Sequence, residues 1–384
     1  MSNNSKNILH VITVSFVINH FFGEQFLYLK KFNNNKYFVA CSKSEHLEEF
    51  SNKLGFKKVE IEISRSINPI IDIIAIYKLI KFIRQNNIHK VVGHTPKGGM
   101  VAMISSFICG ISERIYFRHG IIYETSKGLK KILLKNIDRL SGLLATKVVC
   151  VSNSVREISE KDNLNSREKN IILGLGTCNG IDTENKYNPL RFNDKSRNML
   201  KRKLDINVND FIVGYVGRIV KDKGIEELIN AWGKFDNSVD NLKLLLVGPI
   251  EERNSISEAT KKSININSKI IHIDFVEDAT PYFSIMNLFI LPTYREGFPT
   301  VSLEASSMNL PVLITKATGC KESIIDNVTG QFISHDSEVI KEKILFYYKN
   351  RQLAIKHGNS GREFVRNNFE QTKIWEIISK ELKL

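Results

Sequence analysis

The chain of 384 residues is 42% hydrophobic and 25% charged, which is typical of a folded globular protein, and it has no run of about 18 uncharged apolar residues that would cross a membrane. Its length exceeds what one hydrophobic core usually organises, so we expect two domains. The net charge of +14 is concentrated in residues 1–185, which hold 26 basic and 16 acidic residues. This excess suits an anionic membrane surface, a phosphorylated substrate or a nucleic acid.

Two features of the sequence concern the compartment in which the protein works. The segment Met1–Lys6 is polar and lacks the basic start, apolar core and cleavage site of a signal peptide. The cysteines show neither a CxxC pair nor the spacing of a metal site, and we interpret them as reduced thiols. They are Cys41, Cys109, Cys150, Cys178 and Cys320. Both features predict a cytoplasmic protein.

In the front half, short runs rich in β-branched and aromatic residues alternate with longer amphipathic stretches. This alternation predicts βα repeats and a parallel sheet. The expected strands are Ile8–Val14, Tyr37–Cys41, Val59–Ile63, Lys90–Gly93, Glu113–Phe117 and Lys147–Val151. The expected helices are Glu24–Lys31, Leu47–Leu54, Pro69–Gln85, Gly98–Ile108 and Gly128–Ala145.

A polar stretch rich in Gly and Asn, Gly174–Pro189, precedes a charged helix at Arg191–Lys203, and the alternation then restarts. The back half is expected to contain the strand-like and helical runs Phe211–Gly217, Ile225–Gly233, Leu242–Gly248, Ser255–Ile264, Ile270–Phe275, Thr280–Ile285, Leu288–Pro292, Thr300–Ser307 and Val312–Thr315. We therefore expect an α/β protein of two Rossmann-like, doubly wound domains, residues 1–185 and 186–365. Residues 366–384 are expected to form a C-terminal helix that packs back toward the first domain.

The most informative motif sets Glu296 and Glu304 on either side of a turn marked by Gly and Pro, directly after an apolar run. A buried strand that leads into such a turn and then a helix forms the ligand-binding corner of an open α/β sheet. The backbone N–H groups that open the helix suit a diphosphate, and the carboxylates accept hydrogen bonds from hydroxyl groups. A nucleotide sugar carries both kinds of group.

A second motif brings cations to the same edge of the sheet. The strand that ends at Gly217 is followed by a loop with Arg218 and Lys223, and a helix begins at Gly224. Arg218 is suited to bidentate binding of a phosphate and Lys223 adds a point charge, so the pair can neutralise a departing diphosphate.

At this point the chain resembles the family 4 glycosyltransferases, and the resemblance covers nearly its whole length. The motifs that carry it are Glu296–Glu304, in which seven residues separate two glutamates, together with Gly217-Arg218 and Lys223-Gly224. The resemblance implies the GT-B fold, in which two Rossmann-like domains face each other across a cleft.

The resemblance also implies roles for individual residues. Arg218 and Lys223 would bind the donor diphosphate, Glu296 would contact the hydroxyl groups of the donor sugar, and Glu304 would bind the ribose. The loop Phe275–Asp278 would seat the nucleobase through Val276. The remaining donor-binding residues would be Gly217, Gly297, Phe298, Pro299 and Thr300.

Motifs of the front half look like those of bacterial polysaccharide and glycan enzymes that act on lipid-diphosphate-linked acceptors. These motifs are His94–Gly99, Arg118–Gly120 and Gly176–Asp182. The resemblance implies an undecaprenyl-diphosphate-linked acceptor, a UDP-linked donor and transfer of an N-acetylhexosamine or related amino sugar. For His119, a structural hydrogen bond on the one hand and a sugar-contacting or catalytic role on the other both remain open.

The turn Thr95–Gly99 joins a strand to a helix and carries Lys97, so it suits the phosphate of the acceptor, with Thr95, Lys97 and Gly98 as candidates. For Lys97 an exposed loop position remains an alternative. Many family members have a Gly-Gly loop after the first strand, but this chain reads Thr13–Gly23 there. We expect Ser15 and Asn19 in that segment to contact the acceptor instead.

Three further expectations concern mechanism and partners. The resemblance implies retention of the anomeric configuration by same-face attack, and we expect no metal because no DxD pair is placed to hold one on a diphosphate. The stretch Lys127–Lys147 places apolar and basic residues at helical spacing, which predicts peripheral docking on the cytoplasmic face of the inner membrane, unless the apolar face is turned to the core.

Alternative functions stay open at this point. Another GT-B-like enzyme that uses a different donor, such as a sugar-nucleotide epimerase, would need the same diphosphate site. A donor-binding protein that has lost turnover would also fit. A nucleic-acid-binding protein is suggested by charge alone, but no helix-turn-helix, zinc or RNP-type motif supports it, and we expect no nucleic-acid partner.

Overall fold

The computed structural model describes residues 5–66, 68–235 and 239–384. Residues 1–4 of the polar segment Met1–Lys6 lie outside that part. The chain divides into two compact units, one of Met1–Gly180 with Gln371–Leu384 and one of Ile181–Glu370. The chain passes into the second unit five residues before the expected boundary at residue 185, and it returns five residues after residue 365.

In the described part of the chain, the first unit holds a parallel sheet of seven strands in the order β3-β2-β1-β4-β5-β6-β7. The strands are β1 (Asn7–Val11), β2 (Lys36–Cys41), β3 (Lys57–Glu60), β4 (Lys90–His94), β5 (Glu113–Arg118), β6 (Lys147–Cys150) and β7 (Asn170–Ile171). This is the doubly wound order, and it reverses between β1 and β4.

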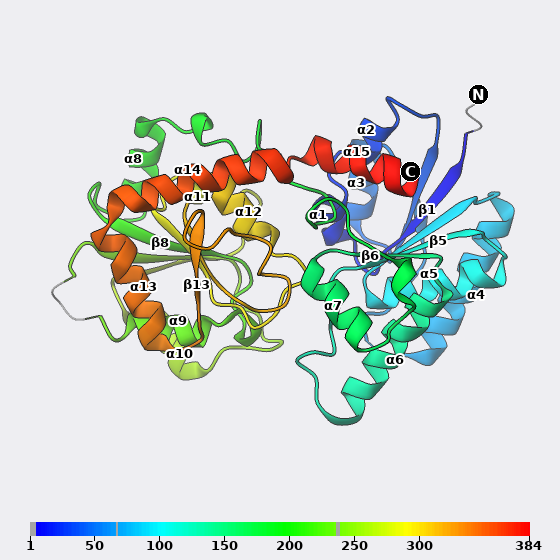
Figure 1. Ribbon diagram of the computed structural model, residues 1–384, viewed down its shortest axis with the longest axis horizontal. Coiled ribbons are helices and arrows are strands. Elements are labelled where there is room, and N and C mark those ends of the chain that lie inside the picture. The colour runs from blue at the N-terminus through cyan, green and yellow to red at the C-terminus, as the bar shows by residue number, and fades with distance from the viewer. Residues whose placement is uncertain (1–4, 67, 236–238) are drawn as a thin grey trace. The chain divides into compact units, whose positions relative to one another are not determined.

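Helices cover both faces of the first sheet (Figure 1). The α-helices of this unit are α1 (Ile18–Phe21), α2 (Gln25–Leu29), α3 (Glu45–Leu54), α4 (Pro69–Gln85), α5 (Pro96–Ile108), α6 (Gly128–Leu144), α7 (Asn153–Lys161) and α15 (Gln371–Leu382), with short 3-10 turns at Ser15–Val17 and Arg167–Lys169. Helix α5 packs between α4 and α6 on one face. On the other face, α15 packs beside α2 and α2 beside α3.

The second unit repeats the same topology. Its sheet has six described parallel strands in the order β10-β9-β8-β11-β12-β13, which reverses between β8 and β11. The strands are β8 (Phe211–Val216), β9 (Leu242–Val247), β10 (Ile270–Ile273), β11 (Leu288–Leu291), β12 (Val312–Thr315) and β13 (Gly330–Ile333).

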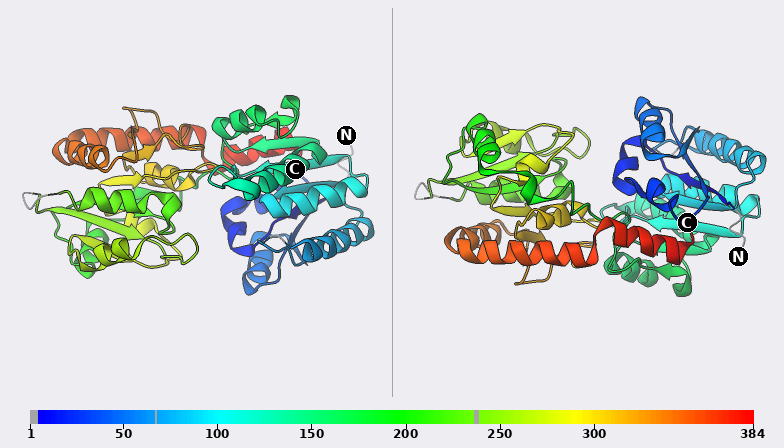
Figure 2. Two further views of the ribbon diagram at one scale, coloured as in Figure 1. Left: turned by 90° about the horizontal axis from the view of Figure 1, so that it is seen from below. Right: turned by 90° about the horizontal axis from the view of Figure 1, so that it is seen from above.

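Helices also cover both faces of the second sheet (Figure 2). They are α8 (Asp194–Lys203), α9 (Ile225–Trp232), α10 (Glu258–Ile266), α11 (Thr280–Phe283), α12 (Thr300–Ser307), α13 (Ser337–Lys349) and α14 (Arg351–Asn368), with 3-10 turns at Pro189–Arg191 and Lys221–Lys223. Helix α13 packs against α9, and α12 packs against α14.

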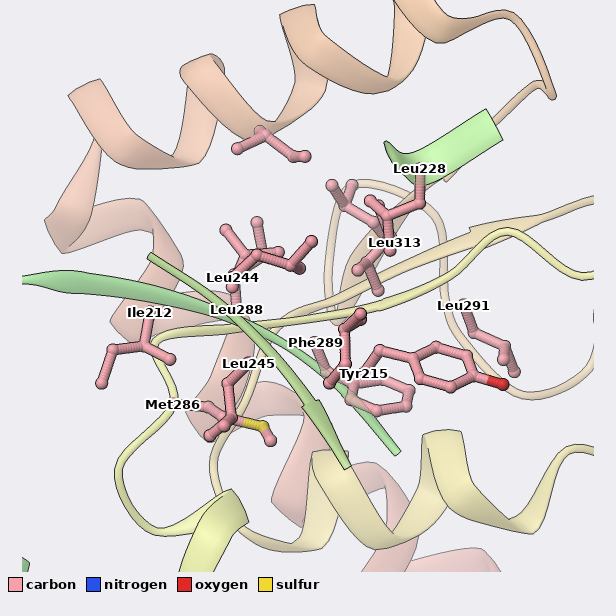
Figure 3. Close-up of a cluster of buried hydrophobic side chains, with 14 of the residues drawn as sticks. Ile212, Tyr215, Leu228, Leu244, Leu245, Met286, Leu288, Phe289, Leu291 and Leu313 are labelled. Atoms are coloured by element: carbon pink, nitrogen blue, oxygen red, sulfur yellow. The ribbon is translucent and has the colours of Figure 1, made fainter. Parts of the chain in front are cut away.

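Strands β9, β11 and β12 of the second unit are nearly continuous apolar runs in the sequence because they lie in the core. Every residue of β9 except Lys243 is buried, and β11 and β12 are buried throughout. Figure 3 shows that the successive side chains Leu244 and Leu245 lie on opposite sides of the strand, as the alternation of a strand requires. Because helices cover both faces of the sheet, the side chains on both faces of each strand are apolar.

The α/β class of two doubly wound units is confirmed, while several elements differ from the expectation. Strand β3 begins two residues earlier than Val59, and β1 ends at Val11 instead of Val14. The helix expected from Gly98 begins at Pro96, since Thr95 caps it and proline is favoured in a first turn. Elements that the sequence patterns did not predict are α1, α7, β7, β13, α13 and α14.

Candidate active site

The candidate site of the second unit lies where the strand order reverses, at the carboxyl ends of β8 and β11. Two loops meet there, one after each strand. The Thr293 hydroxyl and the Tyr294 N–H donate to the carbonyl oxygen of Asp222 over 3.1 and 2.9 Å. The cationic loop and the glutamate turn are therefore tied together by hydrogen bonds, as expected for neighbouring strands at a switch point.

Gly224 allows this close approach of the two loops. Its φ is +71°, and a Cβ atom at this position would lie 1.9 Å from the carbonyl oxygen of Pro292. Any side chain would therefore force the β8 loop away from β11, so the glycine between the cationic turn and α9 is a packing requirement.

Lys223 and Glu296 form an ion pair across the two loops. The Lys223 Nζ atom lies 2.5 Å from Oε1 of Glu296, and the two side chains are 18% and 14% exposed. The Glu296 N–H donates to Thr318 O over 2.9 Å, which fixes the backbone of the turn. A cation and a carboxylate are thus held side by side, where a charged ligand can bind the one and a hydroxyl group the other.

Arg218 is held in a different way. Its Nη1 atom lies 2.8 Å from Oε2 of Glu251, in a pair whose side chains are 50% and 35% exposed. The Tyr215 hydroxyl donates to Arg218 O over 2.8 Å and supports the turn from below. Because exposed pairs contribute little, the guanidinium can exchange Glu251 for a phosphate at small cost.

The turn between the two glutamates leads into α12, which begins at Thr300. Pro299 stands at its N-cap without a side-chain hydrogen bond. The Phe298 ring packs against Phe369 at a centroid distance of 5.4 Å, in a small core separate from the main one. The side chain of Phe298 thus anchors the turn.

Glu304 lies in the second turn of α12 and is partly buried. Burial raises the pKa of its carboxyl group, although a hydrogen bond from Tyr187 opposes this rise. Burial and the nearby carboxylate of Glu304 also raise the pKa of Tyr187 well above its usual value, so the phenol remains a donor. Tyr187 therefore orients Glu304, a role that nothing in the sequence pattern indicated.

The loop after β10 contains Val276, the residue expected to contact the nucleobase. Val276 is partly buried against the main core, whereas Phe275 is 71% exposed. Asp278 accepts hydrogen bonds from the N–H and hydroxyl of Thr280, the first residue of α11. In the described residues, no group of three or more His, Cys, Asp or Glu side chains is arranged to hold a metal ion.

The switch point of the first unit lies at the ends of β1 and β4. Thr95 has φ +63°, an uncommon value for a residue other than glycine, and its side chain accepts a hydrogen bond from Gly98 N–H. The Thr95 and Thr13 hydroxyl oxygens lie 2.6 Å apart. A Cβ at Gly98 would lie 3.1 Å from Ile12 Cα, so the start of α5 packs tightly on the end of β1.

The other candidates of the first unit lie in contrasting environments. Lys97 is buried on α5 and forms an ion pair with Asp72 of α4, so the exposed loop position considered for it is wrong. Ser15 is buried and accepts a hydrogen bond from Ser44 over 2.7 Å. Asn19 is exposed on α1, and His119 is partly buried after β5.

Comparison with known proteins supports an enzyme. Residues 196–364 match the family described as "Glycosyl transferases group 1", and residues 8–152 match "Glycosyl transferase 4-like". The capsular polysaccharide biosynthesis glycosyltransferase CapM of Staphylococcus aureus is 33% identical over 376 residues, which are 97% of this chain and 96% of CapM. The chain belongs to glycosyltransferase family 4.

More distant relatives of this glycosyltransferase are named for lipid-linked substrates. The UDP-Gal:alpha-D-GlcNAc-diphosphoundecaprenol alpha-1,3-galactosyltransferase of Escherichia coli is 25% identical over 252 residues, 64% of this chain and 62% of that protein. The N,N'-diacetylbacillosaminyl-diphospho-undecaprenol alpha-1,3-N-acetylgalactosaminyltransferase of Campylobacter jejuni is 22% identical over 333 residues, 85% of each chain.

Solved structures show the same fold. A glycosyltransferase of Rickettsia africae superimposes with a TM-score of 0.81 at 21% identity, covering 99% of this chain and 98% of that one. HepE of Anabaena, in complex with UDP-glucose, gives 0.81 at 16% identity over 98% and 99% of the two chains. The predicted GT-B fold of the glycosyltransferase is confirmed.

Sequence reasoning missed several residues that shape the candidate site. Asp222 joins the two loops and also pairs with Arg295 over 3.3 Å, Glu251 holds Arg218, and Tyr187 contacts Glu304. Asp222 lies in the cationic loop, and a carboxylate between Lys221 and Lys223 is the feature of the sequence that could have indicated its role. The partners Glu251 and Tyr187 come from distant segments, and only folding brings them to the site.

Proposed function

We propose that this glycosyltransferase moves a sugar, an N-acetylhexosamine or a related amino sugar, from a UDP-sugar to an undecaprenyl-diphosphate-linked saccharide in surface polysaccharide assembly. The observation that carries the proposal is the Lys223–Glu296 pair, with Arg218 on the same loop. Support comes from the 33% identity to CapM, from relatives named for diphosphoundecaprenol-linked sugars, and from the likeness to HepE in complex with UDP-glucose.

The donor is bound by charge and hydroxyl recognition in the second unit. Arg218 and Lys223 stabilise the negative charge that grows on the departing diphosphate, together with the backbone of Gly217 and of residues 297–300. Glu296 accepts hydrogen bonds from the sugar hydroxyl groups and Glu304 from the ribose. The backbone of Val276 contacts the base.

The proposed reaction retains the anomeric configuration and proceeds without a metal. The acceptor hydroxyl attacks from the face that the diphosphate leaves, and the leaving phosphate takes the acceptor proton. Arg218 and Lys223 take the place of the divalent ion that neutralises the diphosphate in other transferases. Positive charge is needed there because negative charge grows on the leaving phosphate in the transition state.

The acceptor is proposed to contact the first unit around the end of β1 and β4. Asn19 is exposed for direct contact, and Thr95 presents a constrained turn. Ser15, Lys97 and Gly98 are buried, so their contribution is to hold this surface in place through Ser44, Asp72 and the tight packing of α5. His119 completes the acceptor region.

Helices α4 and α6 are proposed to dock on the anionic cytoplasmic face of the membrane. Leu129 of α6 is 85% exposed and Ile70 of α4 is 72% exposed, and further apolar side chains of both helices share this exposure. Exposed lysines stand among them, at Lys127, Lys130, Lys131, Lys78 and Lys81. Apolar side chains with interspersed cations are the pattern of an interfacial helix.

The side of α6 that carries its exposed apolar residues faces away from the buried side of the helix. The buried residues of α6 are Asp138, Ser141 and Gly142. Asp138 pairs with the fully buried Arg118 over 3.0 Å, and a Cβ at Gly142 would lie 2.9 Å from Arg118 Nη2. A core-facing apolar side for this helix is therefore wrong. In the described residues no helix combines the length and apolar character needed to span a bilayer.

Calorimetric titration with UDP, GDP and ADP tests the donor assignment. We expect preferential binding of UDP, weakened in Glu304→Ala because the ribose loses its acceptor. The matched control is Lys221→Ala, an exposed lysine on the same turn as Lys223, which should bind UDP normally. Preference for another nucleotide would overturn the donor, and binding of none would overturn the transferase proposal.

Product analysis then tests the reaction. UDP-N-acetylhexosamines are incubated with a short-chain polyprenyl-diphosphate sugar, and the anomeric configuration of the new bond is read by NMR. We expect a retained configuration and a lengthened lipid-linked saccharide. Conversion of the donor to an epimer without transfer would replace this proposal by the epimerase alternative.

A further inference from the structure

Three histidines form a hydrogen-bonded chain at the carboxyl end of the first sheet. The Nδ1 atom of His10 lies 3.1 Å from Nε2 of His94, and Nδ1 of His94 lies 3.1 Å from Nε2 of His119. The strand register pairs His10 with Val92 and His94 with Phe117. Because side chains alternate along strands, all three imidazoles lie on one face of the sheet.

The surroundings of the chain keep the imidazoles neutral. His10 and His94 are 1% and 3% exposed, and the Phe21 ring stacks on His119 at a centroid distance of 3.9 Å. Burial lowers the pKa of His10 and of His119 to about 3, and that of His94 well below its usual value. The ammonium of Lys90 further lowers the pKa of His10.

Three neutral imidazoles with two hydrogen bonds have only two arrangements, since each ring carries one N–H group. In the first, His10 donates to His94, His94 donates to His119, and His119 has its proton on Nδ1. In the second, every donor is reversed, so His119 Nδ1 is a bare acceptor and His10 carries its proton on Nε2. The position of the proton on His10 therefore determines the position of the proton on His119.

The buried end of the chain favours the first arrangement. The Nε2 atom of His10 is buried and has no hydrogen-bond partner. In the second arrangement this atom would be a buried, unsatisfied N–H donor close to the charge of Lys90. In the first arrangement the Nε2 atom of His10 carries a lone pair, which the nearby Lys90 cation stabilises. A buried N–H donor without an acceptor is rarer and costs more free energy than a buried acceptor without a donor.

We propose that His10 and His94 are positioning residues that hold His119 in the tautomer with its proton on Nδ1, from which it donates a hydrogen bond to a phosphate or hydroxyl oxygen of the sugar substrate. The proposal rests on the proposed glycosyl transfer. It assigns His119 the role of donor and excludes it as the base that removes the acceptor proton, because its only lone pair on nitrogen is used by His94.

NMR of the full chain labelled with 15N-histidine tests the tautomers without any assay of transfer. Long-range 1H–15N correlations distinguish protonated from bare ring nitrogens, and the variants His10→Gln, His94→Gln and His119→Gln assign the signals. We expect protonated Nδ1 and bare Nε2 on all three rings near neutral pH. A proton on Nε2 of His119 would overturn the proposal even if transfer is demonstrated.

Two ligand probes identify the oxygen that His119 contacts. Farnesyl diphosphate supplies a lipid-linked diphosphate without a sugar, and free N-acetylglucosamine supplies hydroxyl groups without a phosphate. A shift of the His119 Nδ1 resonance with one of them assigns the phosphate or the hydroxyl group, respectively. A shift with neither probe overturns the contact with substrate.

Transfer kinetics separate positioning from packing at His10. His10→Leu keeps the apolar packing against Phe22 and Phe26 but removes the donor, and we expect kcat/KM to fall about tenfold. His10→Gln supplies an amide donor and should restore most of that loss, although it packs less well. A packing role predicts the opposite order. Phe26→Leu is the control for lost aromatic packing and should keep the tautomer of His119.

Discussion

At the scale of single residues, the candidate site depends on pairs formed between distant segments of the chain. Lys223 and Glu296 are separated by 72 residues in the sequence, and their charged atoms lie 2.5 Å apart. Each side chain orients the other and partly neutralises its charge before a ligand arrives. In the proposed mechanism, a diphosphate that binds Lys223 would release Glu296 to accept hydrogen bonds from the sugar, so that donor phosphate and donor sugar would be recognised together.

Removal of either member of this pair should stop transfer without unfolding the protein. We expect Lys223→Ala to lower kcat by on the order of 100-fold to 1,000-fold, because one stabilising contact to the leaving group is lost. Glu296→Gln, which keeps the size of the side chain, should lower it comparably. Circular dichroism and steady-state kinetics measure both effects, with Lys221→Ala as the matched control. Near-normal turnover of either variant would exclude it from the catalytic machinery.

Glu304 should make donor binding depend on pH. Burial raises the pKa of this carboxyl group, and only the ionised form accepts both ribose hydroxyl hydrogen bonds. As the pH falls through this raised pKa, the group takes up a proton and UDP binding should weaken, while binding is at its strongest above it.

Calorimetry of UDP binding between about pH 5 and 8 measures the effect of Glu304. UDP itself titrates near pH 6, so the comparison with Glu304→Gln is essential. We expect the wild type to lose more affinity on acidification than the variant, and identical pH profiles would show that Glu304 does not bind the ribose.

At the scale of elements, the buried face of α6 is not the apolar face that its sequence periodicity indicates. The spacing of its leucines and isoleucines gives an amphipathic helix, but the polar and small residues Asp138, Ser141 and Gly142 face the core. The charge of Arg118 beneath the helix requires this choice, since a buried guanidinium needs a paired carboxylate. Leu129, Ile132, Leu133, Leu140 and Leu143 remain exposed, and these are the side chains proposed to contact a lipid surface.

Polar substitution of the exposed face of α6 should weaken membrane binding. For Leu129→Asn with Ile132→Asn we expect at least a tenfold loss of affinity for vesicles containing anionic lipid, because about 1–2 kcal/mol is lost for each apolar side chain. Sedimentation with vesicles measures this loss. Leu190→Asn with Met199→Asn, which replaces two residues of the second unit that are at least as exposed, should bind as the wild type does. Equal losses in both pairs would reject α6 as the docking element.

At the scale of the whole molecule, the chain completes its first unit only with its last helix. Lys90 at the start of β4 is fully buried, and its ammonium donates to the carbonyl oxygens of Leu382 and Lys383 at the end of α15. Trp375 donates to Asn179 over 2.8 Å from the same helix. A cation at the C-terminal end of a helix satisfies carbonyl groups that lack intrahelical partners and opposes the helix dipole.

Loss of this cation should destabilise the first unit. Lys90→Met keeps the length of the side chain but leaves the carbonyl groups at the end of α15 without this donor and leaves Glu113 with Lys6 as its remaining ion-pair partner. We expect the free energy of unfolding to fall by about 1–3 kcal/mol and the amides of α15 to exchange faster. Urea denaturation and hydrogen exchange measure these changes. Lys147→Met removes an exposed lysine that donates to Glu381 O, and it should cost much less; equal costs would show that burial of Lys90 is not the cause.

Parts of the site were predictable because their signals are local in the sequence. Apolar strands that end at Gly217 and Pro292 predicted two neighbouring loops, and the order of strands in a doubly wound sheet brings such loops together at a switch point. The pairing of the cationic loop with Glu296 followed from this topology. The positions of Lys97 and Ser15 were not predictable, because their burial depends on α4 and on Ser44 from other segments.

By itself, the sequence determined the α/β class, the two doubly wound units and the residues that gather at the second switch point, since strand periodicity, turn glycines and capping are properties of neighbouring residues. It did not predict α13 and α14. Only the tertiary structure decided the side of α6 that is buried and the alignment of His10, His94 and His119. Those outcomes depend on which segments pack together, because a buried charge or ring nitrogen must find its partner across the fold.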